Sequence, residues 1–418
     1  MSGLNALYGG RSKTLKQQEE TNMCRTTTKV PVLVAIALAA GGCGGGSSGG
    51  TPPPPAPPPE PFGYSVPDDI GDGWPVGDLA AEGFDTQMIV DMMDSVLDET
   101  YPGIDSVAIA RNGKLLLYWY DRGRELDQFD AWINNTTRER HVLHSTSKSF
   151  TSALVGIAID QGHIESTQVS FLDLFDYTDY ANWDPRKADI TLEDALTMRF
   201  GFQWDEWSLP YTNPENDLVN LENNNVDWPK ALLDLPMASD PGTAFAYNTA
   251  GTIAIGKALE NATGEWLGQF ANTHLFLPMQ ITDARWWSPY SLANGGSGLF
   301  LRTRDLAKFG QLYLDGGAWQ GQQLISAEWI ADSVVRRVDF SDTFTFSEGY
   351  GYQWWLDELP YKSQLLETWV TSGYGGQYLF VIPGLELVVA FTGHNYENAD
   401  GIGNLYTMLR WHILAAID

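Results

Sequence analysis

Cysteine is almost absent from this 418-residue chain, and the two that occur, Cys24 and Cys43, precede the part that can fold. The globular part therefore has no disulfide, no thiol nucleophile and no cysteine-based metal site. The six histidines form no HExxH motif and no other close pair with the spacing of metal ligands. We therefore expect neither a metal site nor a cofactor.

Basic residues are also scarce, with 25 Lys and Arg against 53 Asp and Glu and a formal net charge of −28. Binding to phosphate backbones needs a basic face, so the charge balance excludes nucleic acid as a partner. The excess of acid indicates a well-solvated surface and carries no information about the fold. Hydrophobic residues make up 43% of the chain, which is ample for a sizeable core.

Long hydrophobic runs are missing near the N-terminus, where the apolar stretch PVLVAIALAA (residues 31–40) is too short to span a bilayer. Basic residues precede it and small residues lead from it to Cys43, an order typical of an export signal. The segment resembles a bacterial lipoprotein signal. This resemblance implies lipidation of Cys43 and anchoring to a membrane, facing the periplasm or the cell surface. An ordinary cleaved signal peptide is the alternative.

The chain divides into three parts by composition. Residues 1–22 lack signal character, so we predict that translation starts at Met23 and that the signal segment occupies residues 1–42. Residues 43–63 form a linker whose Gly/Ser half is flexible and whose Pro half is extended. Because neither an internal repeat nor a second linker follows, we interpret residues 64–418 as one catalytic domain.

The periodicity of the globular part is mixed, with strand patterns near both ends and helical patterns between them. We expect an amphipathic helix over 87–97, a hairpin of strands 106–110 and 115–120, helices with long loops over 145–335, a second hairpin of strands 378–382 and 385–391, and a last helix over 403–416. This order predicts an α/β fold. One antiparallel sheet is assembled from both chain ends and flanked by helices, and a mostly helical subdomain is inserted in the middle.

The segment HSTSKSFTSALVGIAIDQGH places a serine and a lysine three residues apart on a helix predicted over 145–160. Ser145 and Lys148 then share one helix face. A serine hydroxyl needs an adjacent base, and a lysine can serve if burial lowers its pKa from about 10.4. A plain helix cap at Ser145 is the alternative. The G-x-S-x-G run at 45–49 lies in the linker and lacks the strand and helix of a hydrolase elbow.

The run STSK opening a helix resembles the first signature of the β-lactamase-related serine hydrolases, which include penicillin-binding proteins, class C β-lactamases and related esterases and amidases. The longer run HSTSKSFTSALVGIAID is most similar to the 6-aminohexanoate-dimer hydrolase branch, and the resemblance extends over about residues 75–418. It implies the β-lactamase/penicillin-binding-protein fold, with Ser145 as nucleophile and Lys148 as its base.

The family's second element matches PGTAFAYNTAGTIAIGKALENATG. Tyr247 falls in the position of the family tyrosine, and Thr249 stands where asparagine is usual. The resemblance implies that Tyr247 passes a proton between nucleophile and leaving group and that Thr249 contacts the substrate. Ionisation of a tyrosine, with a pKa of about 10, would need a positive neighbour such as Lys148. Half-buried packing is the alternative for a lone tyrosine.

The family's third element, a strand-edge Lys-Thr-Gly or His-Thr-Gly, is matched by TSGYGGQYLFVIP, with Thr371 in the place of the cation. The resemblance implies an oxyanion hole formed by the backbone N–H groups of Ser145 and Tyr374. It also implies a substrate-binding strand edge formed by Ser372, Gly373, Gly375 and Gly376. A glycine-rich entry to an ordinary hairpin is the alternative. Trp204, Trp207 and Trp287 are candidates for substrate-facing aromatics, against core packing as the alternative.

These motifs predict acyl transfer through a Ser145 acyl-enzyme on a small-molecule substrate, either a carboxylic ester or a linear amide of the 6-aminohexanoate-oligomer type. β-Lactams and peptidoglycan stems carry a carboxylate that the third-motif cation commonly engages in the family. Thr371 lacks that charge, so β-lactamase or D-Ala peptidase activity is the second hypothesis. A non-catalytic binding lipoprotein is the third, and it would predict loss of residues that are all present.

Overall fold

The computed structural model describes residues 60–340, 347–396 and 399–418. The predicted signal segment, Cys43 and almost all of the predicted linker lie outside these residues. Among the described residues, no helix has the length and apolar character needed to cross a membrane.

An eight-stranded antiparallel sheet forms the centre of the fold, with strand order β2-β1-β13-β12-β11-β10-β9-β8. Its strands are β1 (Ile104–Arg111), β2 (Lys114–Tyr120), β8 (Val338–Asp339), β9 (Gly349–Tyr350), β10 (Trp355–Tyr361), β11 (Gln364–Gly373), β12 (Gln377–Ile382) and β13 (Leu387–Gly393). Strands from the two chain ends meet where β1 pairs with β13, with Val107 opposite Phe391. The predicted sheet and both predicted hairpins are confirmed, whereas the long hairpin β10–β11 was not predicted.

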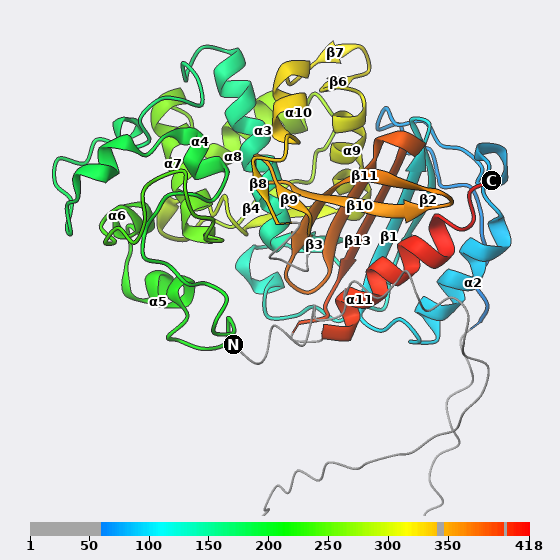
Figure 1. The fold of residues 1–418 in the computed structure, drawn as a ribbon. Helices are drawn as coiled ribbons and strands as arrows, with labels where there is room; N and C mark the ends of the chain where they lie inside the picture. The colour runs from blue at the N-terminus through cyan, green and yellow to red at the C-terminus, as the bar shows by residue number, and fades with distance from the viewer. Residues whose placement is uncertain (1–59, 341–346, 397–398) are drawn as a thin grey trace, which may run out of the picture.

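The central strands β1, β12 and β13 are buried on both faces of the sheet, because helices cover each face. In β12, Tyr378 and Phe380 point into a core shared with α2 (Thr86–Leu97) and α11 (Ala399–Met408). The intervening Leu379 and Val381 point to the opposite core, together with the buried side of α9 (Thr303–Leu314). This alternation follows from the two-residue period of a strand. Burial on both faces explains why β12 and β13 are apolar except at Gln377 and Thr392 near their ends. Figure 1 shows α2 and α11 side by side on one face of the sheet.

The middle of the chain forms the predicted helical part, which lies beside the sheet in Figure 1. Its helices are α3 (Ser147–Asp160), α4 (Leu192–Leu196), α5 (Asp217–Asn224), α6 (Trp228–Leu233), α7 (Thr249–Thr263), α8 (Leu267–Ala271) and α10 (Ala327–Ser333). A separate small antiparallel sheet of order β3-β5-β4 is formed by β3 (Arg140–Val142), β5 (Leu299–Arg302) and β4 (Arg285–Trp286). A further short hairpin is formed by β6 (Ala318–Trp319) and β7 (Gln322–Gln323).

One boundary differs from the sequence prediction at the start of α3. The expected helix began at Ser145, but the structure has a 3-10 turn, η3 (His144–Thr146), before α3 begins at Ser147. His144 adopts a positive φ of 45°, which turns the chain sharply between strand β3 and helix α3. Turn η3 contacts both β11 and β12. The predicted nucleophile therefore lies where the helical part meets the large sheet.

Candidate active site

Ser145 is partly accessible in a stretch that is otherwise buried. All residues from Arg140 to Ala158 are buried except Ser145, whose side chain solvent can partly reach. The sharp turn at His144 accounts for this, because it lifts the following residue out of the packed segment. A hydroxyl that solvent can reach, held on rigid elements, meets the first requirement of a nucleophile.

The Lys148 side chain is buried and points to Ser145. Its Nζ atom lies 3.0 Å from Ser145 Oγ, 2.9 Å from Thr249 Oγ1 and 2.9 Å from the carbonyl oxygen of Gly296. Burial lowers the pKa of Lys148 to about 7, against the opposing effect of the Glu206 and Glu222 carboxyl groups. A lysine with this pKa is neutral in a large fraction of molecules at physiological pH, and a neutral amine can accept a proton.

The Tyr247 hydroxyl forms a hydrogen bond with Ser145. Burial raises the pKa of Tyr247 well above its ordinary value, and the nearby Glu206 raises it further. The tyrosine is therefore protonated at neutral pH, even though Lys148 Nζ lies 4.8 Å from its ring centre. Its ring is held by stacking with Trp207 and Trp355, at centroid distances of 4.8 and 5.8 Å. The structure thus brings the three predicted catalytic residues together, with Tyr247 in the proton-donating form.

A buried carboxylate that the sequence analysis did not single out lies behind Thr249. Glu206 is only 2% exposed, and it accepts hydrogen bonds from both the backbone N–H of Thr249 (2.7 Å) and the Thr249 hydroxyl. Thr249 thus stands between Lys148 and Glu206. The sequence signal was weak: Glu206 closes the run MRFGFQWDE and lies 43 residues before Thr249. An acidic residue between two tryptophans was the one local hint.

The third motif packs directly against the nucleophile turn. The Thr371 hydroxyl is buried and donates to Thr146 Oγ1 at 3.0 Å, so this position ties β11 to η3. A side chain at Gly373 would place its Cβ 2.3 Å from the carbonyl oxygen of Leu143, so only glycine lets the strand pass this close. Next to them Ser372 is partly exposed at the strand end.

The two predicted oxyanion donors belong to neighbouring segments. Tyr374 begins the turn from β11 to β12, and its ring centre lies 5.7 Å from that of His144, the residue before Ser145. The turn passes through Gly375 and Gly376, both with positive φ (85° and 103°), a conformation that glycine adopts without strain. Turn η3, which holds Ser145, also contacts β11 and β12, the strands on either side of Tyr374.

Aromatic side chains surround this junction. Trp132 and Trp287 stack at a centroid distance of 4.1 Å, and Phe129 links Trp132 to His144 through edge-to-face contacts. Of the three tryptophans singled out from the sequence, Trp287 is part of this stack and Trp207 stacks on Tyr247. Trp204 instead supports the site from within, since its indole N–H donates to the carbonyl oxygen of Tyr247 at 3.0 Å.

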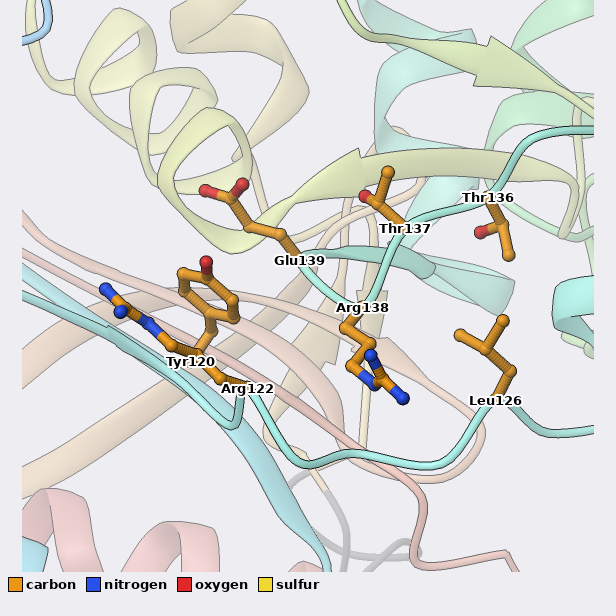
Figure 2. Close-up of a pocket in the computed structure, with 7 residues that line it drawn as sticks. All are labelled: Tyr120, Arg122, Leu126, Thr136, Thr137, Arg138 and Glu139. Atoms are coloured by element: carbon orange, nitrogen blue, oxygen red, sulfur yellow. The ribbon is translucent and has the colours of Figure 1, made fainter.

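Figure 2 shows a pocket of about 480 Å³ that lies apart from the predicted site residues. It is lined by Tyr120, Arg122, Leu126, Thr136, Thr137, Arg138 and Glu139. The guanidinium groups of Arg122 and Arg138 point in different directions there. Most of these lining residues belong to the connection between β2 and β3. The same connection contains Phe129 and Trp132, two of the aromatic residues near Ser145.

A partly exposed serine beside a buried lysine and a protonated tyrosine, set between an antiparallel sheet and a helical part, defines a serine hydrolase. Residues 86–409 match the family model described as Beta-lactamase. This is well over half of the chain, and the protein belongs to that family.

Individual relatives are distant. The 6-aminohexanoate-dimer hydrolase of Paenarthrobacter ureafaciens is 26% identical over 289 residues, which cover 63% of this chain and 66% of that protein. The chain thus matches just under two thirds of that relative's length. Among solved structures, a penicillin-binding protein from Bacillus halodurans superposes with a TM-score of 0.56 at 16% identity, covering 74% of this chain and 98% of the other. A family VIII carboxylesterase gives a TM-score of 0.56 at 18% identity, covering 79% and 98%. At these identities the two structures establish the fold.

Proposed function

We propose that this protein hydrolyses carboxylic esters and linear amides through a covalent acyl-enzyme on Ser145. The observation that carries the proposal is the position of Lys148 Nζ, 3.0 Å from Ser145 Oγ, with a pKa that burial lowers to about 7. A hydroxyl nucleophile needs a base within hydrogen-bond reach whose pKa is near the working pH, and Lys148 meets both conditions.

Acylation begins when Ser145 Oγ attacks the carbonyl carbon while its proton passes to neutral Lys148. The carbonyl oxygen becomes an oxyanion, which the backbone N–H groups of Ser145 and Tyr374 stabilise. The bond from carbon to the leaving oxygen or nitrogen then breaks. Tyr247 gives its proton to the leaving group and regains one from the Lys148 ammonium, so the charges return to their starting values.

Deacylation repeats these steps with water. Lys148, neutral again, takes a proton from a water molecule that attacks the acyl carbon, and the proton then returns to Ser145 Oγ as the carboxylic acid leaves. The protonated Tyr247, bonded to Ser145, is suited to this shuttle because it can donate to one partner while it accepts from another.

The third motif and the aromatic residues near Ser145 support the proposed substrate class. Thr371 carries no charge, and its hydroxyl is already engaged with Thr146, so it does not serve a substrate carboxylate. The stacked Trp132 and Trp287 offer an apolar surface near Ser145 for an uncharged acyl or alcohol group. The similarity to the 6-aminohexanoate-dimer hydrolase supports linear amides as substrates.

The test is turnover of neutral p-nitrophenyl esters by the purified protein, together with labelling by a fluorophosphonate. We expect Ser145→Ala to abolish both turnover and label. Ser152→Ala is the matched control. Ser152 lies on the same helix, and its buried hydroxyl has no hydrogen-bond partner among the described residues, so we expect unchanged activity. Absence of label on Ser145 in the wild-type protein would favour a binding protein over an enzyme.

A substrate panel separates the finer alternatives. We expect short-chain esters and a 6-aminohexanoate-type linear dimer to be cleaved faster than a cephalosporin or a D-Ala-D-Ala peptide. The opposite ranking would assign the protein to the β-lactamase or D-Ala peptidase activities. The comparison is made as kcat/KM, because that ratio measures discrimination between competing substrates.

We also propose that the protein is exported and lipid-anchored through Cys43, from the order of basic, apolar and small residues before that cysteine. Expression of the full chain in a bacterium with a radiolabelled fatty acid tests this. We expect label and membrane association in the wild type, and neither in Cys43→Ser. Release of an unlabelled mature protein from the wild type would support an ordinary signal peptide instead.

A further inference from the structure

Glu206 is the most heavily hydrogen-bonded group around the proposed base. Its Oε2 atom accepts from the Thr249 backbone N–H at 2.7 Å and from the Trp204 indole N–H at 3.3 Å. Its Oε1 atom accepts from the Thr249 hydroxyl and from the Tyr211 hydroxyl at 2.9 Å. A carboxylate has about four acceptor positions, so these four donors fill it.

We propose that Glu206 is a positioning residue that, through the Thr249 hydroxyl, reserves one hydrogen-bonding direction of Lys148 for Ser145. This inference rests on the proposed acyl-enzyme function and deepens it. The Thr249 hydroxyl has a single hydrogen, and with an ionised Glu206 beside it that hydrogen points to the carboxylate. The oxygen of Thr249 can then only accept from Lys148.

The other fixed partner of Lys148 imposes the same direction. The carbonyl oxygen of Gly296, 2.9 Å from Nζ, can only accept a hydrogen bond. A neutral lysine has two N–H groups, and the two acceptors Thr249 Oγ1 and Gly296 O use both. Its lone pair is then left for the third neighbour, Ser145 Oγ, at 3.0 Å. In this arrangement the serine donates its proton to the base without a rearrangement.

Without the Glu206 carboxylate the Thr249 hydroxyl could turn and donate its own hydrogen to the lysine lone pair. It would then compete with Ser145 for the base. Glu206→Gln enforces this competition, because the amide can satisfy the site in one orientation only. Its oxygen must face the N–H groups of Thr249 and Trp204, so its NH₂ group faces the two hydroxyl oxygens and drives the Thr249 hydrogen towards Lys148.

Glu206 also connects the base to the residue proposed to supply an oxyanion N–H. Tyr211, which donates to Glu206, packs its ring edge-on against Tyr374 at a centroid distance of 5.6 Å. The Glu206 carboxylate therefore binds two residues of the site. One is Thr249, the partner of Lys148, and the other is Tyr211, whose ring packs against Tyr374.

The titratable groups that face Glu206 come from several elements: Lys148 of α3, Tyr211, Glu222 of α5, Tyr247 and Tyr350 of β9. Burial raises the pKa of Glu206 itself, while Lys148 and the hydrogen bonds from Thr249 and Tyr211 lower it. Burial also raises the pKa of Glu222 to about 8, so Glu222 is mostly protonated at pH 7. The pKa of Glu206 is raised overall, with burial as the largest cause. Four donors nevertheless face its two oxygens, an arrangement that fits an ionised carboxylate and leaves no acceptor for a proton on Glu206 itself.

The experiment measures kcat, KM and the pH profile of Glu206→Gln with a neutral p-nitrophenyl ester. We expect kcat to fall at least tenfold with KM changed less than threefold. We also expect the acid limb of kcat/KM to move to lower pH by about one unit, because a negative neighbour that raised the pKa of Lys148 is lost. In a partly misfolded protein, kcat/KM would be lower at every pH, but the acid limb would stay at the same pH. Titration with a fluorophosphonate measures how many active sites are folded.

Thr249 provides the decisive comparison. Because Glu206 acts through the Thr249 hydroxyl, Thr249→Ser should be more active than Thr249→Val. Glu206→Gln should cost much less in a Thr249→Val background than in the wild type. Glu215→Gln, an exposed carboxylate on the same connection, is the matched charge control and should change nothing. An active wild type with an unchanged profile in Glu206→Gln, or additive losses in the double variant, overturns this inference alone. An inactive, unlabelled wild type overturns the proposed function instead.

Discussion

Lys148 Nζ lies 3.0 Å from Ser145 Oγ, and burial of the lysine lowers its pKa to about 7. The base is active in its neutral form, which predominates above that pKa. For an ester without titratable groups we therefore expect kcat/KM to rise about tenfold per pH unit below pH 7 and to level off above it. The measurement is a pH profile from 5 to 9. A flat profile over this range would exclude Lys148 as the general base.

Tyr247→Phe removes the hydroxyl that bonds Ser145 and keeps the ring that stacks with Trp207 and Trp355. Because the hydroxyl is proposed to protonate the leaving group, the loss should depend on how much help that group needs. We expect kcat/KM to fall by about 10²–10⁴ for an amide or alkyl ester, and clearly less for a p-nitrophenyl ester. Equal losses on both substrates would contradict the role, and thermal unfolding serves as the control for stability.

Gly373→Ala tests the close contact between β11 and the nucleophile turn. The added Cβ would lie 2.3 Å from the carbonyl oxygen of Leu143, which is backbone and cannot rotate away. We expect a destabilisation of about 1–3 kcal/mol and a loss of activity of at least tenfold, since the shift reaches Ser145 two residues on. Gly403→Ala, where the same atom meets open space, should leave activity intact. Wild-type activity in Gly373→Ala would show that β11 can move without cost.

Asp105 links three segments, since it accepts hydrogen bonds from His141 (2.6 Å) and His394 (2.8 Å). Burial alone would raise the pKa of Asp105, but the two histidines outweigh it and lower the pKa to about 2. The folded-state pKa is thus below the unfolded value of about 3.9. The resulting stabilisation, about 2 kcal/mol, is complete above pH 5 and is lost as the pH falls from about 4 to 2.

At pH 7 the free energy of unfolding of Asp105→Asn should therefore be about 2–4 kcal/mol lower than that of the wild type. Urea denaturation measures this difference as a lower midpoint concentration. Between pH 5 and 3 its stability should also fall less steeply than that of the wild type. Glu125→Gln, which removes an exposed carboxylate, is the control and should keep the wild-type pH dependence. Parallel stability curves for Asp105→Asn and the wild type would show that the histidine bonds do not stabilise the fold.

The local parts of the fold were predictable because their signals are local. The hairpin β1–β2 turns at Asn112 and Gly113, and the hairpin β12–β13 turns at Pro383 and Gly384. Both pairs are residue types that favour turns, so the sequence indicates them. The hairpin β10–β11 was missed because it turns at Lys362, which adopts a φ of 50° without being glycine. A positive φ at lysine leaves no mark in the sequence.

In the active site, too, the residues that are close in sequence were predictable from local signals and the distant ones were not. The spacing of Ser145 and Lys148 on adjoining helical turns is a property of consecutive residues, so the sequence by itself determined that pair. Tyr247 and the Thr371–Gly373 strand were located through resemblance to the family, because roughly 100 and 225 residues separate them from the serine.

What only the tertiary structure decided is the network behind these residues. Glu206 acts on Lys148 through Thr249, and Asp105 joins histidines 36 and 289 residues away. Such contacts depend on how the sheet and the helical part are packed together, and no periodicity records them. The lowered pKa of Lys148 has the same origin. The sequence supplies the amine, but segments distant in the sequence bury it and exclude water, which destabilises the ammonium form and allows the amine to act as a base.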